Sequence, residues 1–472
     1  MSPRLSLALT LMALLAGCAV GPDYQRPTLA LPQQWAEATD GNTWQPAAPG
    51  DRYPRGEWWR IFKDETLDRL EQQALIGNFT LKAALARVEQ ARALLGISSS
   101  ARSPTLDLSE RSTRTLTSSN RPGTGNGAVT STLQNDHVLG LGLSYEADLF
   151  GRIQRDVEAS SAGLEQSQAD LENARLILTA DVASAYFALR SQEADIDLLQ
   201  QTADLQERSL ALVRSRYALG AVSGLDLAQQ ELLLGNTRSQ WQLALRQQAQ
   251  QRHALATLLG IDAARVELKK SALPTTLPDI PLALPGVLLQ RRPDIASAER
   301  AVAAANAQIG VASSAWFPGL RISASNGLES KNWGALLDAP SNTWSLGLAF
   351  SQILFDGGRT RSRVAQAEAG HQLATANYRQ TVLKALQEVE DALASRRTLA
   401  AAALESNRAA SGAEKAANIT ASRYRLGAAT ALEHLVTEQN ALNARRQVLQ
   451  LEGQQWANAV LLIRALGGGW GE

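Results

Sequence analysis

The residue whose chemistry stands out is Cys18, because it is the only cysteine in a chain of 472 residues. It follows an apolar run at residues 5–16, which begins after Arg4 and is separated from the thiol by Gly17. A basic start, an apolar segment of this length and small residues at its end are typical of a secretory signal peptide. A thiol at such a cleavage point is well placed to accept a lipid.

Residues 15–18 read Leu-Ala-Gly-Cys, which resembles a bacterial lipobox. The resemblance implies a signal peptide at 1–17 and a Cys18 that carries an S-diacylglycerol and an N-acyl chain. Each buried CH₂ of such chains contributes about 0.8 kcal/mol, so a multiply acylated cysteine holds firmly to a bilayer. Residue 19 is Ala rather than Asp, which in bacterial lipoproteins points to the outer membrane. The alternative is a buried cysteine in an ordinary secreted protein.

Other chemical sites are excluded by composition and spacing. A single cysteine rules out a disulfide framework and a cysteine-rich zinc site, and the four histidines lie far apart. The chain has no GxxxxGK[ST], HExxH or GxSxG motif, and the glycines at 123–127 lack the spacing of a phosphate loop. The sequence therefore predicts no enzyme, no cofactor and no metal. Because 46 basic residues balance 46 acidic ones, a nucleic-acid partner is not expected either.

The body of the chain repeats itself, which indicates an internal structural duplication. RYxLGA at 216–221 recurs at 423–428, and LG at 259–260 recurs at 466–467. After a lipidated N-terminal arm at 18–60, which is rich in proline and polar residues, we expect a first repeat at 61–262. A connector at 263–285 and a second repeat at 286–472 follow. The arm is expected to extend along the protein surface, with a disordered linker as the alternative.

Each repeat is expected to read helix, strand, strand, long helix, turn, helix. In the long helix, about 152–218, the apolar positions alternate at spacings of four and three, a 3.5-residue period typical of coiled coils. The stripe runs through Leu178, Val182, Leu189 and Leu199 to Tyr217, which we expect to pack in it. Such a helix is about 100 Å long. Helices at 66–100 and 225–259, each about 52 Å, would match it when stacked end to end.

Two short segments alternate between apolar and small or polar residues. Residues 138–150 place Leu139, Leu141 and Leu143 on one face, and residues 343–355 repeat the pattern. This period is typical of transmembrane barrel strands. We expect their hairpin partners at about 103–117 and 317–328, with exposed tips at 118–136 and 329–342. A soluble sheet with one wet face is the alternative.

Four strands per chain cannot close a barrel, since small barrels need about eight. An open edge in lipid would leave backbone groups without hydrogen-bond partners. If the strands span a membrane, the chain must therefore oligomerise, and three copies would supply twelve strands.

The whole chain resembles the TolC-like outer membrane factors, in particular the lipoprotein branch of tripartite multidrug efflux systems of Gram-negative bacteria. The matching stretches cover both repeats and both ends of the chain. They are CAVGPDYQRP at 18–27, WWRIFKDETL at 58–67, YEADLFGR at 145–152, RPDIASAE at 292–299, LFDGGR at 354–359 and LGGGW at 466–470.

The resemblance implies a membrane α+β fold. The implied assembly is a homotrimer whose 12-stranded transmembrane β-barrel continues into a long periplasmic α-helical coiled-coil barrel. It also implies a passive exit duct for drugs or other small toxic compounds, bound to a periplasmic adaptor protein and an inner-membrane efflux pump. Two alternatives remain open: an exit duct for type I protein secretion and a structural coiled-coil envelope lipoprotein.

The turns at 219–223 and 426–430 should form the inner, periplasmic end, where the resemblance implies contact with the adaptor. Gly220 and Gly427 suit the left-handed residue that ends a helix, so ordinary capping explains them equally well. The expected adaptor-contact residues are Gly220, Ala221, Val222, Gly427, Ala428 and Ala429.

Near these tips lie the candidates for a periplasmic gate, with Glu414 further up its helix than the others. By resemblance, Arg423 would link neighbouring protomers and hold the resting aperture shut. The other gate candidates are Tyr424, Arg216 and Glu414. Relatives often carry Asp directly before the Arg-Tyr pair, whereas this chain has Ser422.

Overall fold

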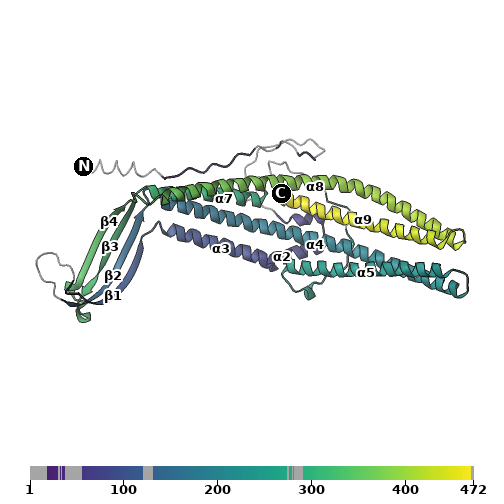
Figure 1. The fold of residues 1–472 in the computed structure, drawn as a ribbon, viewed down its shortest axis with the longest axis horizontal. Coiled ribbons are helices and arrows are strands. Elements are labelled where there is room, and N and C mark those ends of the chain that lie inside the picture. The colour runs from purple at the N-terminus through teal and green to yellow at the C-terminus, as the bar shows by residue number, and fades with distance from the viewer. Residues whose placement is uncertain are drawn as a thin grey trace. The chain divides into compact units, whose positions relative to one another are not determined.

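The computed structural model describes residues 19–29, 32, 35–37, 56–120, 131–273, 276–278, 280 and 291–468. They form helices and one four-stranded sheet (Figure 1). The chain divides into two compact units. The first comprises Met1–Thr28, Val88–Ser167 and Ala298–Tyr378, and the second comprises Leu29–Arg87, Gln168–Ser297 and Arg379–Glu472.

The first unit contains the sheet, which is antiparallel throughout and has the strand order β1-β2-β3-β4. Its strands are β1 (Thr105–Leu116), β2 (Leu133–Ala147), β3 (Gly319–Ser330) and β4 (Asn342–Ser351). The expected ranges differ from these bounds by a few residues. The largest difference is at β2, which begins at Leu133 because its polar start still pairs with the end of β1.

The two long helices have the same length. Helices α4 (Arg152–Ala218) and α8 (Arg359–Arg425) each contain 67 residues. The expected heptad stripe of α4 is buried at Leu178, Val182, Leu189 and Leu199, as its 3.5-residue period requires. Tyr217 is an exception: we expected it to pack in the stripe, but it is 49% exposed because the stripe ends one turn earlier.

The expected single helix at 66–100 is wrong, because the chain breaks at Asn78 into α2 (Glu65–Gly77) and α3 (Phe79–Ser100). The Asn78 side chain donates to the carbonyl of Leu258 (2.9 Å) and accepts from the amide of Leu81 (2.9 Å). It therefore caps α3 and also satisfies a carbonyl near the end of α5 (Gly224–Leu259). Helix α5 ends where α3 begins.

A similar joint connects α9 (Ala431–Ala465) with α7 (Pro293–Ser313). Arg292, directly before α7, donates to the carbonyl of Ala465 at 3.1 Å and pairs with Asp294 and Glu388. Gly467 makes room for the joint, because a Cβ there would lie 3.0 Å from the Arg291 backbone. In both joints a side chain before one helix binds a terminal carbonyl of another.

The apolar core of the second unit lies around α2, α4, α5, α8 and α9. Trp58, Trp59 and Phe62, in the 3₁₀ helix η1 (Trp58–Phe62), are buried there. The indole nitrogen of Trp58 donates to Thr179 at 3.0 Å, and Phe62 packs edge-on against Phe187. The short helices η2 (Ala263–Arg265), η3 (Ser314–Trp316), η4 (Trp333–Ala335) and η5 (Ala339–Ser341) complete the described elements.

In the described part of the chain, no helix has both the length and the apolar character that a bilayer crossing demands.

Candidate functional site

One face of the sheet is apolar and open to the surroundings. On β4, Trp344, Leu346, Leu348 and Phe350 are between 67% and 75% exposed. The register places their neighbours from the other strands on the same face, since directly paired residues of adjacent strands point to the same side. These neighbours are Leu106 and Leu108 of β1, Leu141, Leu143 and Tyr145 of β2, and Leu320 and Ile322 of β3.

The opposite face carries small and polar side chains. Ser325 of β3 and Ser345 of β4 are hydrogen-bonded at 2.8 Å, and Arg111 of β1 lies 3.6 Å from the carboxylate of Asp136 on β2. An apolar face backed by a polar one matches a sheet between lipid and water.

The outer strands β1 and β4 each pair with a single neighbour among the described strands. Their other edges therefore present backbone N–H and C=O groups that can pair with another strand. Within one chain, the sheet therefore has two edges at which further strands could pair.

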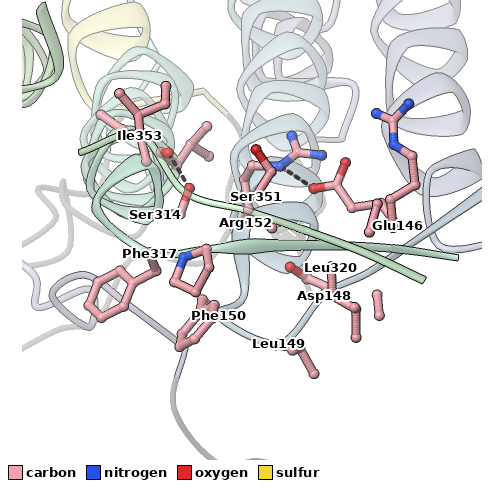
Figure 2. Close-up of a pocket in the computed structure, with 18 of the residues that line it drawn as sticks. Glu146, Asp148, Leu149, Phe150, Arg152, Ser314, Phe317, Leu320, Ser351 and Ile353 are labelled. Carbon is pink, nitrogen blue, oxygen red and sulfur yellow. Dashed lines mark hydrogen bonds and ion pairs between the residues drawn. The ribbon is translucent and has the colours of Figure 1, made fainter. Parts of the chain in front are cut away.

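A cavity of about 670 Å³ lies where the strands of the first unit meet its helices. Figure 2 shows Leu149, Phe150 and Phe317 on one side of the strand ends and the Arg152–Glu146 pair on the other. The Phe150 and Phe317 rings stack with centroids 4.9 Å apart, and the charged pair is 2.8 Å long. The apolar and polar faces of the sheet thus continue to its junction with the helices.

The helix turns that contain the expected adaptor-contact residues have nearly identical geometry. Gly220 (φ 69°) and Gly427 (φ 74°) take the left-handed conformation, as expected for a helix C-terminus. The amide of Ala221 donates to the carbonyl of Arg216 and that of Ala428 to the carbonyl of Arg423, both at 2.8 Å. In the second unit of Figure 1, both turns lie at the same end of the helices.

Capping boxes fix the helices that leave these turns. Ser223 and Asp226 cap α5, and Thr430 and Glu433 cap α9. Leu219 and Leu426 are each 83% exposed in the turns. Of the other tip residues, Val222 and Ala429 are partly buried, and Ala221 and Ala428 are exposed. Each turn therefore presents a rigid backbone with an uncovered leucine.

The structure does not bring the four gate candidates together within one chain. The Arg423 side chain donates to the carbonyl of Ala428 at 3.1 Å, so it braces its own turn. The Tyr424 ring stacks on His434 of α9 with centroids 5.3 Å apart. Glu414 hydrogen-bonds Arg445 of α9, and this bond lowers the pKa of the Glu414 carboxyl. Arg216 is partly exposed near the first turn.

Cys18 lies outside the described residues, but the arm that follows it is docked on other segments of the first unit. The guanidinium of Arg155 on α4 donates to the carbonyl of Val20 and to Asp23. Asn306 of α7 donates to the carbonyl of Pro22 at 2.9 Å, and the hydroxyl of Tyr24 donates to Glu299 of α7. We call residues 19–26 the docked arm.

Sequence reasoning missed this docking site. Arg155, Glu299 and Asn306 lie on helices far from the arm in sequence, and each reads as an ordinary polar helix residue. Glu299 is only 1% exposed, and its carboxylate pairs with Arg300 of the same helix (2.9 Å) and accepts from Tyr24 of the arm. The one sequence feature that could have indicated this docking site is the small residue Gly310, which lies close to Gly21 in the structure.

Comparison with known proteins identifies the family. The model of the outer membrane efflux protein family matches residues 70–261 and 284–468. SrpC of Pseudomonas putida, a solvent efflux pump outer membrane protein, is 33% identical over 470 residues, 98% of this chain and 98% of SrpC. OprJ of Pseudomonas aeruginosa, an outer membrane protein, is 32% identical over 474 residues, 100% of this chain and 97% of OprJ.

The fold agrees with a solved structure. The outer membrane channel CmeC of Campylobacter jejuni matches with a TM-score of 0.88 at 27% identity, over 96% of this chain and 95% of CmeC. The chain belongs to the outer membrane efflux protein family. The expected TolC-like family, the efflux function and the outer membrane localisation are thereby confirmed. These relatives are channel and efflux proteins rather than enzymes.

Proposed function

We propose that this chain forms a homotrimeric exit duct of a tripartite efflux system. The observation that carries the proposal is the sheet with an exposed apolar face and two open edges. The apolar face is unfavourable in water, and the unpaired backbone groups of the edges are unfavourable in lipid. Pairing β1 of one chain with β4 of the next closes a barrel in the membrane, which places the apolar face in lipid and gives the edge groups hydrogen-bond partners.

Three chains make a barrel of twelve strands, which leaves an interior wider than side chains can fill. Eight strands give an interior that side chains just fill, and the interior widens with strand number. The polar face, with Ser325, Ser345 and Arg111, would line this interior. Small molecules could then diffuse through this water-filled passage without an energy source in the duct itself.

The helices would form the periplasmic continuation of the duct. The proposed duplication gives each chain two hairpins, α4–α5 and α8–α9, so a trimer would surround the tunnel with equivalent walls from the first and second repeats. The heptad spacing of α4 supports close packing of long helices side by side. The turns at Gly220 and Gly427 would then meet the periplasmic adaptor, with Leu219 and Leu426 as exposed apolar contacts.

The cargo would be small toxic compounds delivered by an inner-membrane pump. This part of the proposal rests on relatives, since SrpC serves solvent efflux. A type I protein-secretion duct is the second candidate, and a structural envelope lipoprotein would not explain the apolar sheet face.

The proposed lipid anchor is Cys18, acylated after removal of residues 1–17. Its support is the lipobox-like sequence and a mature arm whose first described residues are docked beside the sheet. Anchor and barrel would then hold the same chain in the outer membrane.

Planar-bilayer conductance of the purified protein, together with drug and solvent susceptibility of a strain lacking the gene, tests the function. We expect discrete channels and loss of resistance to small toxic compounds, restored by the wild-type gene. A protein that never conducts would contradict the duct, and lost protein export with normal drug resistance would favour type I secretion.

A further inference from the structure

The docked arm is in direct backbone contact with the segment that follows strand β2. The amide of Val20 donates to the carbonyl of Phe150 at 3.1 Å. A Cβ added at Gly151 would lie 2.9 Å from the Cα of Ala19, so the two backbones are in direct contact. The first described residue of the arm is therefore fixed against the junction between β2 and α4.

Two glycines hold the next residues equally close. A Cβ added at Gly21, whose φ is +104°, would lie 2.5 Å from the Cα of Gly310 on α7. A Cβ at Gly310 would lie 2.8 Å from the carbonyl oxygen of Val20 and 2.7 Å from Cγ of Arg155. Side chains at either position would lift the arm from α7.

Beside this contact lies the aromatic pair Phe150–Phe317. The rings stack with an interplanar angle of 25° and lie on the side of the strand ends opposite the Arg152–Glu146 pair (Figure 2). Leu320, on the apolar face of the sheet, is drawn on the same side as the pair. Both rings flank β2 and β3, the inner strands of the sheet, away from its open edges. Phe317 is 40% exposed and Phe150 is partly buried.

We propose that the acyl chains of Cys18 lie against the Phe150–Phe317 pair, so that the lipid anchor is a fixed part of the barrel surface and not a free tether. The inference rests on the proposed acylation of Cys18. The Cα atoms of Cys18 and Ala19 are about 3.8 Å apart, so the lipid begins within one residue of the fixed backbone.

The position of the lipid is set by the arm and not by attraction to the rings. Membrane hydrocarbon is as apolar as an aromatic side chain, so an acyl chain gains little by exchanging one neighbour for the other. The contact therefore depends on Arg155, Asn306 and the glycine pair, which hold the arm in register with the strand end. Displacing the arm should remove the contact and leave acylation intact.

Photo-cross-linking tests the proposal in cells. The full-length protein is expressed with a fatty acid that carries a diazirine and an alkyne, irradiated, purified and digested, and cross-linked peptides are identified by mass spectrometry. We expect the wild-type chain to cross-link to its own peptides that contain Phe150 or Phe317.

Two glycine variants distinguish a displaced arm from a general loss of folding. Gly310→Ala introduces the clash with Val20 but favours the helix by about 1 kcal/mol, so it should still assemble and carry the label while losing these cross-links. Gly163→Ala is the matched control, because a Cβ there meets nothing within 4 Å, and it should behave as wild type.

Cross-links confined to lipid or to other regions of the chain would overturn the inference, as would unchanged cross-links in Gly310→Ala. If the wild-type chain takes up no more label than Cys18→Ser, the proposed acylation itself is wrong and the inference falls with it. Label incorporation therefore distinguishes the two failures.

Discussion

Glu71 of α2 is a fully buried carboxyl group without a hydrogen-bond partner on either oxygen among the described residues. Burial raises its pKa from 4.5 to about 10, and the charge of Asp68 acts in the same direction. The folded protein therefore holds Glu71 protonated at neutral pH. The unfolded chain releases that proton above pH 4.5.

The sign of the resulting pH dependence follows from linkage. Below pH 4.5 both states are protonated and the group adds no pH-dependent cost, whereas the folded state loses stability as the pH rises from 4.5 toward 10. At pH 7 the loss is at most about 3 kcal/mol. We predict that Glu71→Gln unfolds at a higher temperature than wild type at pH 7, and that the gain disappears near pH 4.

Thermal unfolding followed by circular dichroism at several pH values measures this difference. Glu89→Gln is the control, because Glu89 is exposed on α3. A gain for Glu71→Gln that does not change with pH would show that the carboxyl is ionised in the folded protein.

Arg423 braces the turn after α8 through the carbonyl of Ala428. We predict that Arg423→Ala leaves the fold intact and allows ions to leak through the resting channel, since the removed side chain lies at the proposed aperture. Bilayer conductance is the measurement, and Arg408→Ala, on the exposed surface of the same helix, is the control. An unchanged resting conductance would count against Arg423 as a gate residue.

At the residue scale, the sequence predicts what depends on local geometry. Gly220 and Gly427 were recognisable because a helix C-terminus needs a left-handed residue. The partners of Arg423, Tyr424 and Glu414 were not, because they lie on α9 or across a turn. A neighbouring side chain in another helix leaves no local pattern in the sequence.

The sheet is the element whose two faces make the clearest contrast. We predict that Leu346→Arg, on the exposed apolar face, destabilises the membrane-embedded protein by about 2–4 kcal/mol, the cost of an arginine near the bilayer centre. The adjacent Ser345→Arg, on the polar face, should be tolerated because it would point into the proposed water-filled interior.

The amount of assembled protein in the outer membrane fraction, measured on gels run without heating, compares these variants. Equal assembly of the two would mean that lipid does not cover the apolar face, and reversed effects would mean that the faces are assigned the wrong way round.

At the element scale, periodicity is a reliable guide where one face is buried over many residues. It places α4 at 152–218, since the heptad stripe runs through most of the helix. It fails at Asn78, because both sides of the break read as helix and only the contact with Leu258 shows why the chain bends there. Tertiary hydrogen bonds of this kind override local propensity.

The whole molecule must contain more than one chain if the sheet spans a membrane. We predict that the detergent-extracted protein has the mass of three chains, because three is the copy number expected for twelve strands. Native mass spectrometry gives the number directly. A monomer that still conducts would contradict closure by sister strands.

The joints at Asn78 and Arg292 also affect how the helix lengths of such a molecule can change during evolution. Each joins two helices through side chains rather than through continuous backbone, so α3 and α5, like α7 and α9, are separate helices although α4 and α8 are continuous. Whole heptads could be added to α4 and α5 together, or to α8 and α9, without altering α3 or α7. A hairpin could thus be lengthened to suit a different periplasmic spacing while the membrane-facing end keeps its dimensions.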